Sequence, residues 1–328
     1  MNIGPSSGID FKAVRNTCEL IKSEVGKVVV GYEDVVDDLL VCLITQNHML
    51  MLGIPGIAKT TLAKTFSAVT GLSCSRVQFT QDLLPSDIIG HHYFDQKTSS
   101  FQLRLGPIFT EIMLADEINR SPPKTQSALI ESMQEKQVTI EGTTLPLPSP
   151  FLVIATKNPI ETEGVYPLPE AQLDRFLYRV SMDYLKPELE LEMLRHKNNN
   201  TSTSVRVVGR EAVKSLIGLH HKIYTDQSIL TYILSILNET RHTDKVVLGG
   251  SPRAGEHLLY ASKAYALIHG KEYVIPDDVK AVAPKVLGHR LLLSAESELE
   301  GLSTEKVIDD ILRAVEVPDI VESVVLTR

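Results

Sequence analysis

The chain has 328 residues, of which 43% are apolar and 23% are charged, and its formal net charge is −8. This composition excludes a largely disordered chain and predicts one or two globular domains. The acidic balance argues against a surface built mainly to bind nucleic acid. No apolar run approaches the roughly 18 residues that span a membrane, and the N-terminus lacks the basic and apolar regions of a secretion signal. Three widely spaced cysteines indicate reduced thiols, and together these features predict a cytoplasmic protein.

Predicted helices at the start of the chain give way to strands that alternate with helices. Helical periodicity covers residues 11–46. Short apolar runs then alternate with helical patterns, and we expect strands at residues 49–52, 75–78, 112–115, 151–155 and 178–182. This alternation predicts an α/β fold with a mainly parallel sheet that is flanked by helices on both faces.

Two inserts and a helical second part complete the expected organisation. Residues 84–108 and 138–150 each contain alternating apolar and polar residues beside a turn, which predicts two hairpins. Strand signals fade after Lys186-Pro187. We therefore expect an α/β domain at residues 1–185, with its N-terminal helical lead-in, and a smaller all-α domain at residues 186–328.

A close match to a phosphate-binding loop follows the first predicted strand. In the pattern G-x-x-x-x-G-K-[ST], backbone N–H groups wrap the phosphates, the Lys reaches the β- and γ-phosphates, and the hydroxyl ligates Mg²⁺. The chain departs from the pattern only at Ala58, where a second glycine is expected, so spacing alone leaves the match incomplete. The candidate nucleotide-binding residues are Gly53, Pro55, Gly56, Ile57, Ala58, Lys59, Thr60 and Thr61, and Thr60 is also a candidate Mg²⁺ ligand.

Acidic and amide side chains follow two later strands. Asp116 and Glu117 end one apolar run, and strand alternation predicts that they point to different sides. One carboxylate could then hold the Mg²⁺ shell while the other orients or deprotonates an attacking water. Asn158 ends the next strand and could hydrogen-bond this water or the γ-phosphate, although a turn-forming Asn before Pro159 is the alternative.

Two arginines are further candidates. Arg175 lies at the end of a short predicted helix, from which it could stabilise charge on the transferred phosphoryl group, including that of a neighbouring subunit. A structural ion pair with Asp174 or Glu170 is the alternative. Arg253 follows Ser251-Pro252, a pattern typical of a helix start, and it could contact the nucleotide from that helix end.

In this order the motifs resemble those of AAA+ ATPases, and more closely the MoxR branch of the helix-2-insert clade. In that branch the phosphate loop has the sequence G-x-P-G-x-A-K-T, so alanine at position 58 agrees with the family's pattern. Three further stretches also match sequence motifs of this branch, namely residues 116–120, 170–176 and 251–254. The resemblance covers roughly residues 29–291. Lys157 is a departure, because the family more often has Gln before Asn-Pro, and it places an extra charge beside Asn158.

The resemblance implies roles for the matched residues. Lys59 would contact the phosphates, Thr60 and Asp116 would serve Mg²⁺, and Glu117 would be the catalytic base. Val30-Gly31 resembles the stretch that lines the adenine pocket.

Three further positions resemble parts that sense or complete the site. Asn158 looks like sensor 1, Arg175 like an arginine finger acting in trans and Arg253 like sensor 2. The insert at residues 84–108 is similar to the helix-2 insert of the clade, and the hairpin at residues 138–150 to its pre-sensor-1 hairpin.

The resemblance also implies an activity. It predicts a Mg²⁺-dependent ATPase that acts as a chaperone-like machine on protein partners, assembled as a homo-hexamer with ATP at the subunit interfaces. A protein carrying a von Willebrand factor type A domain is a partner that the resemblance suggests. The alternative is a nucleic-acid-dependent, helicase-like motor, which the acidic charge disfavours. A third hypothesis is a nucleotide-gated binding protein with negligible turnover.

Overall fold

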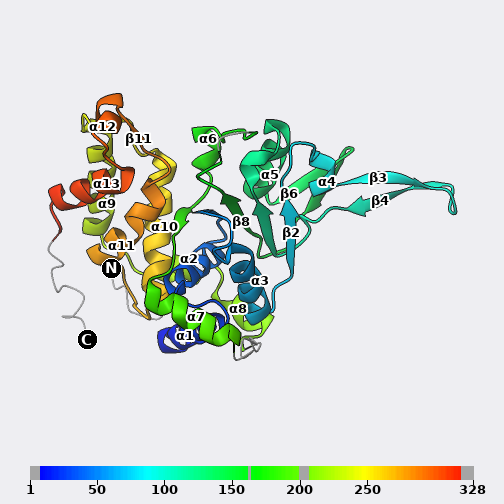
Figure 1. The fold of residues 1–328 in the computed structure, drawn as a ribbon. Helices are drawn as coiled ribbons and strands as arrows, with labels where there is room; N and C mark the ends of the chain where they lie inside the picture. The colour runs from blue at the N-terminus through cyan, green and yellow to red at the C-terminus, as the bar shows by residue number, and fades with distance from the viewer. Residues whose placement is uncertain (1–7, 162–163, 199–206, 319–328) are drawn as a thin grey trace. The chain divides into compact units, whose positions relative to one another are not determined.

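The computed structural model describes residues 8–161, 164–198 and 207–318 (Figure 1). These residues form two compact units. One consists of Leu20–Ile217, and the other combines residues 8–19 with residues 218–318. None of the helices in the described ranges has the length and apolar character needed to span a bilayer.

A five-stranded sheet forms the centre of the first unit. Its strand order is β2-β5-β8-β1-β9, and every neighbouring pair is parallel. The strands are β1 (Met49–Gly53), β2 (Cys74–Gln78), β5 (Ile112–Asp116), β8 (Leu152–Lys157) and β9 (Tyr178–Met182). The α/β class and all five strands expected from the apolar runs are therefore confirmed.

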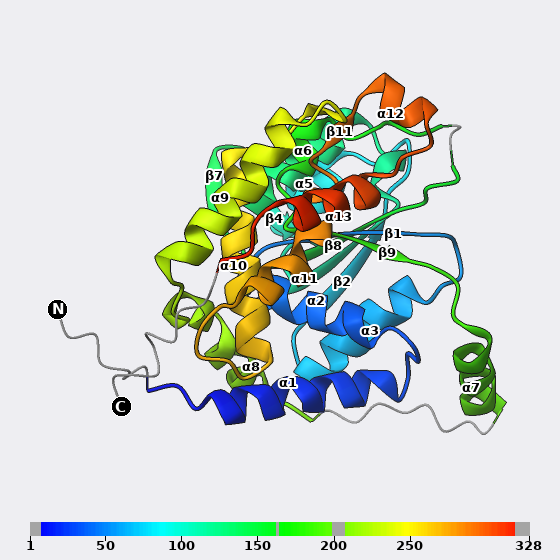
Figure 2. The same cartoon turned by 90° about the vertical axis from the view of Figure 1, so that its left-hand side faces the viewer.

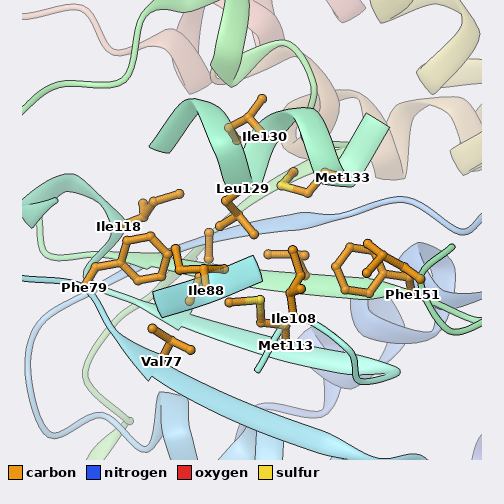
Figure 3. Close-up of a cluster of buried hydrophobic side chains, with 14 of the residues drawn as sticks. Val77, Phe79, Ile88, Ile108, Met113, Ile118, Leu129, Ile130, Met133 and Phe151 are labelled. Atoms are coloured by element: carbon orange, nitrogen blue, oxygen red, sulfur yellow. The ribbon is translucent and has the colours of Figure 1, made fainter. Parts of the chain in front are cut away.

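Helices cover both faces of this sheet, as buried parallel strands require. Helices α2 (Glu33–Ile44) and α3 (Lys59–Thr70) lie on one face, and α5 (Pro123–Glu135) lies on the other (Figure 2). On the α5 face, Leu129 and Met133 belong to a buried apolar cluster with Met113 of β5 and Phe79, which follows β2 (Figure 3). This core holds the strand ends in fixed positions relative to one another.

Both predicted hairpins are present in this unit. The first pairs β3 (Gly90–Asp95) with β4 (Ser100–Leu105) and projects from the rest of the unit in Figure 1. The second pairs β6 (Gln137–Ile140) with β7 (Thr143–Pro146). The remaining elements with residues in this unit are α1 (Phe11–Gly26), α4 (Pro85–Ile89), η1 (Ile118–Arg120), α6 (Glu170–Leu173), α7 (Pro187–Asn198) and α8 (Arg210–Leu216).

The second unit is mainly helical. Its elements after residue 217 are η2 (Leu219–Lys222), α9 (Gln227–His242), β10 (Val246–Leu248), α10 (Pro252–Ile268), α11 (Pro276–Leu287), β11 (Leu292–Leu293), α12 (Ala295–Leu299) and α13 (Thr304–Ala314). Strands β10 and β11 pair antiparallel, so the part expected to be all-α carries one short two-stranded sheet. The predicted cap is present, because Ser251 Oγ accepts a hydrogen bond of 3.1 Å from the Ala254 N–H.

The first unit ends at Ile217, whereas the sequence analysis places the domain boundary near Leu185. Leu185 and Leu189 of the α7 region lie over Gly31, since a Cβ at Gly31 would meet the Leu185 Cδ2 atom at 2.6 Å. Arg210 of α8 forms an ion pair with the buried carboxylate of Glu111, with 2.7 Å between Nη2 and Oε1. These contacts join the α7 region to the turn before α2 and α8 to the residue before β5, although the sequence pattern of both segments is purely helical.

His48 is a buried histidine at the start of β1. Its Nδ1 atom accepts a hydrogen bond of 3.0 Å from the Val153 N–H, so the proton lies on Nε2, which donates to the Met133 carbonyl at 3.0 Å. Burial lowers the pKa of His48 to about 4, and the bond to Met133 only partly offsets this effect. The folded protein therefore holds a neutral imidazole.

We predict that the free energy of unfolding decreases as the pH falls from 6.5 toward 4, because the unfolded chain protonates His48 before the folded chain does. Above the pKa of His48 in the unfolded chain, the folded state keeps its full stability. A pKa shift of this size corresponds to a loss on the order of 3 kcal/mol in the free energy of unfolding at acidic pH. Urea unfolding at several pH values measures it. His48→Gln, whose amide can replace both hydrogen bonds, should depend less on pH in this window. An equal pH dependence in the two proteins would contradict the assignment.

Candidate active site

The carboxyl edge of the sheet brings most of the candidate residues together. The register pairs Leu52 of β1 with Lys157 of β8, so Gly53 and Asn158 leave the sheet side by side. Asp116 ends β5, the strand next to β8. Ligands of open α/β sheets bind at this edge.

The loop between β1 and α3 folds back on itself in a conformation suited to anions. Gly56 and Ala58 have φ angles of 89° and 65°, both in the left-handed region, and α3 begins directly after Ala58. Left-handed residues next to a helix N-terminus turn successive N–H groups toward one concave side. Lys59 Nζ donates to the Gly53 carbonyl and closes the loop. A side chain at Gly53 would collide with Ile57.

Lys59 is half-buried and faces the acidic residues of the site. Burial lowers its pKa, while the charges of Asp116, Glu117 and Glu161 act in the opposite direction. The ammonium group thus lies within electrostatic reach of all three carboxylates. A cation in this place is suited to phosphate oxygens entering the loop.

Thr156 of β8 tethers both acidic residues, a role that the sequence analysis does not predict. Its Oγ1 atom donates to Asp116 Oδ1 at 2.6 Å and accepts from the Glu117 N–H at 2.9 Å. Glu117 has a φ of 59° and lies outside β5, so the strand alternation used to place the two side chains on different sides does not extend to it. The sequence feature that could have indicated this role of Thr156 is a hydroxyl residue at the polar end of an otherwise apolar run.

Strand β2 supplies two further partners that sequence reasoning missed. Arg76 contacts Asp116 Oδ2 through Nε at 3.0 Å and Nη2 at 2.8 Å. Gln78 Nε2 donates to Glu117 Oε2 at 2.7 Å. Both lie on the strand that pairs with β5, with Gln78 in register with Asp116.

The segment after β8 returns to the same acids. Asn158 is buried, and its Oδ1 atom accepts a hydrogen bond of 3.3 Å from the Ile160 N–H. The pKa of Glu161 is lowered mainly by its hydrogen bond from Arg120 and further by one from Asn158. Arg120 Nε also lies 3.0 Å from Glu117 Oε2.

The remaining candidates are Val30, Gly31, Arg175 and Arg253. Val30 is buried and Gly31 has a φ of 83°, in the turn before α2. Arg175 follows α6, and its buried Nε atom has no hydrogen-bond partner in the described part of the chain. Arg253 is half-buried in the first turn of α10, in the other unit.

Comparison with known proteins identifies the family. Residues 48–178 match the family model described as "ATPase family associated with various cellular activities (AAA)", and residues 238–311 match that of the AAA lid domain. Over 296 residues the chain is 43% identical to the protein YeaC of Bacillus subtilis, covering 90% of this chain and 92% of the relative. Over 325 residues it is 40% identical to the chaperone MoxR1 of Mycobacterium tuberculosis, covering 96% and 86%. The chain belongs to the MoxR family of AAA+ ATPases.

A solved structure agrees with this assignment. A crystal structure from Cytophaga hutchinsonii, of a protein assigned as an ATPase, has a TM-score of 0.87 and 41% sequence identity, covering 94% of this chain and 97% of that one. The nucleotide handled by this MoxR-family protein is therefore ATP, which it hydrolyses. Ala58 in its phosphate loop is the residue that the family resemblance predicts at this position.

We predict that two substitutions at Ala58 differ in their effect on ATP binding. Ala58→Gly should leave ATP affinity within a few-fold of the parent value, because glycine adopts the left-handed conformation freely. Ala58→Val should weaken ATP binding by about tenfold or more, because a β-branched residue at positive φ is strained. Titration with a fluorescent ATP analogue measures both. If Ala58→Val binds as tightly as the parent, the left-handed conformation at this position is not needed for binding.

Proposed function

We propose that the carboxyl edge of the sheet binds ATP with Mg²⁺ and hydrolyses it. The observation that carries this proposal is the single hydroxyl of Thr156, which holds Asp116 and the Glu117 backbone beside the loop of Lys59. The loop from Gly53 to Thr61 would enclose the phosphates, with Lys59 on the β- and γ-phosphates. The adenine would lie near Val30 and Gly31.

The residues present fit a magnesium ion. Thr60 and Asp116 would hold it, because Mg²⁺ prefers oxygen ligands and takes one or two from the protein, with phosphates and water completing the shell. Asp116 already holds the guanidinium cation of Arg76, so its environment accommodates positive charge. The ion would neutralise charge that develops on the phosphates.

Side chains of this chain would act on the attacking water and on the phosphates. Glu117 would take a proton from the attacking water, and Asn158 would orient this water or the γ-phosphate. The half-buried Lys59 would stabilise negative charge on the β- and γ-phosphates. Lys157 would add a positive charge next to Asn158.

We further propose that the site is completed in a homo-hexameric ring. Arg175 would act in trans on the ATP of a neighbouring subunit, and its unpartnered Nε atom supports a role toward a group outside the described part of the chain. Arg253 would act as sensor 2, a role that rests on the resemblance alone.

The proposed partners are proteins. The relative from Mycobacterium tuberculosis is named a chaperone, and the resemblance suggests a client with a von Willebrand factor type A domain. The β3–β4 hairpin supports polypeptide binding, since Phe94 and Phe101 are 53% and 73% exposed and their ring centroids lie 5.4 Å apart. Cys18, Cys42 and Cys74 form no disulfide within the described ranges, which fits a cytoplasmic location. A nucleic-acid motor would instead show hydrolysis stimulated by DNA or RNA, with a steep loss at high salt.

We predict that Glu117→Gln lowers kcat for ATP hydrolysis by about 100-fold or more, because an amide cannot accept the proton of the attacking water. ATP affinity should stay within a few-fold, since the phosphate loop is unchanged. Phosphate release and titration with a fluorescent ATP analogue measure the two quantities. Undiminished ATP hydrolysis in this variant would contradict the assignment of Glu117 as the catalytic base.

The same variant tests the trans arrangement. Arg175→Ala should also lose turnover, yet mixing it with Glu117→Gln should restore part of the activity. A mixed interface can then combine the intact Glu117 of one subunit with the intact Arg175 of its neighbour. No recovery in mixtures that exchange subunits would contradict the trans role of Arg175.

A further inference from the structure

Arg120 bridges the proposed catalytic base and the segment that follows β8. Its Nε atom lies 3.0 Å from Glu117 Oε2 and donates to Glu161 Oε2 at 2.9 Å. Its Nη2 atom lies 2.7 Å from Glu161 Oε1. One guanidinium thus binds Glu161 through two nitrogens and still touches Glu117, a fork geometry that lysine cannot supply.

The local backbone fixes this arrangement. Glu117 adopts a left-handed conformation, and the single turn of η1 that follows is closed by a hydrogen bond of 2.9 Å from the Arg120 N–H to the Glu117 carbonyl. Residues three apart in such a turn lie on the same side, so the Arg120 side chain reaches back over Glu117.

Glu161 connects this pair to the proposed water-orienting residue. It follows Asn158 by three positions, and the Oδ1 atom of Asn158 accepts a hydrogen bond of 3.3 Å from the N–H of Ile160, the residue before Glu161. Arg120 and Glu161 therefore connect Glu117 to the short segment that carries Asn158. Without the guanidinium, no cation would lie between the carboxylates of Glu117 and Glu161 in the described part of the chain, while Gln78 Nε2 would still donate to Glu117 Oε2.

We propose that Arg120, held by Glu161, is a positioning residue that fixes the carboxylate of Glu117 relative to Asn158. The inference rests on the proposed function, in which these two residues act on the attacking water. Positioning is the relevant effect because small misplacements of a catalytic group cost large factors in rate.

The exposure of Arg120 separates this role from a structural one. Its side chain is 42% exposed, and ion pairs of exposed side chains contribute little to stability. Removing it should therefore leave the fold intact. If Arg120 positions Glu117, its removal should instead lower the rate of ATP turnover.

The test compares Arg120→Gln, Arg120→Lys and Glu161→Gln in the full chain. Arg120→Gln should lower kcat by about 10- to 100-fold while ATP affinity stays within a few-fold. Arg120→Lys should recover part of this loss, because it restores the charge without the fork. Glu161→Gln should lower kcat less, and the double variant should be no slower than Arg120→Gln alone, since both act through the same carboxylate. An unchanged or raised kcat, or strictly additive losses, would overturn the proposal.

Two controls make the outcome specific. Arg313→Gln removes an ion pair of α13 with 2.6 Å between Nη2 and Asp309 Oδ2, and it should leave turnover unchanged. Glu117→Gln, measured in parallel, separates the two claims. If it retains turnover, the proposed function fails. If it loses turnover while Arg120→Gln does not, only the positioning role of Arg120 fails.

Discussion

The rest of the site depends on two hydrogen bonds made by the hydroxyl of Thr156. It donates to Asp116, the last residue of the neighbouring strand, and accepts from the backbone N–H of Glu117, the residue that follows. This requires β5 and β8 to end at the same level, which the parallel register and the apolar core on the α5 face ensure. Anchored there, the chain turns left-handed at Glu117 and carries Arg120 back over the acids.

The charges of the site are paired in a way that leaves room for a polyphosphate. Lys59 is bound to the Gly53 carbonyl, and Arg76 is bound to Asp116. In the proposed function, phosphates would replace the carbonyl as the partner of Lys59, and Mg²⁺ would share Asp116 with the guanidinium. Because both existing contacts are made by long, flexible side chains, they can be exchanged without moving the strands. The acids themselves are held by Thr156 and need not move.

Local patterns in the sequence were enough to predict the strands, the loop and the two acids. Apolar runs of strand length, such as residues 112–115, report burial directly, and the phosphate loop is a contiguous motif. The roles of Thr156 and Arg76 could not be predicted in this way, because they depend on the register between strands that are far apart in the sequence. The same holds for the end of the first unit at Ile217, which is set by long-range contacts such as that of Arg210 with Glu111.

The resemblance to a family supplied what local chemistry left open. Spacing alone made Ala58 a departure from the phosphate loop, and the structure gives it the left-handed conformation that usually selects glycine. The family's form of the loop contains alanine at this position, and the relatives at 40% identity and above place the chain in that family. The fold and the ATPase activity follow from this membership, whereas the roles of the individual site residues, including Arg175 and Arg253, are proposals.

The most direct test of the account is a crystal structure of the protein with Mg²⁺ and a non-hydrolysable ATP analogue. The account predicts phosphates enclosed by residues 53–61, with Lys59 Nζ moved from the Gly53 carbonyl to the phosphate oxygens. Thr156 should still bind both Asp116 and the Glu117 N–H. A nucleotide bound elsewhere, with Lys59 still on Gly53, would contradict it.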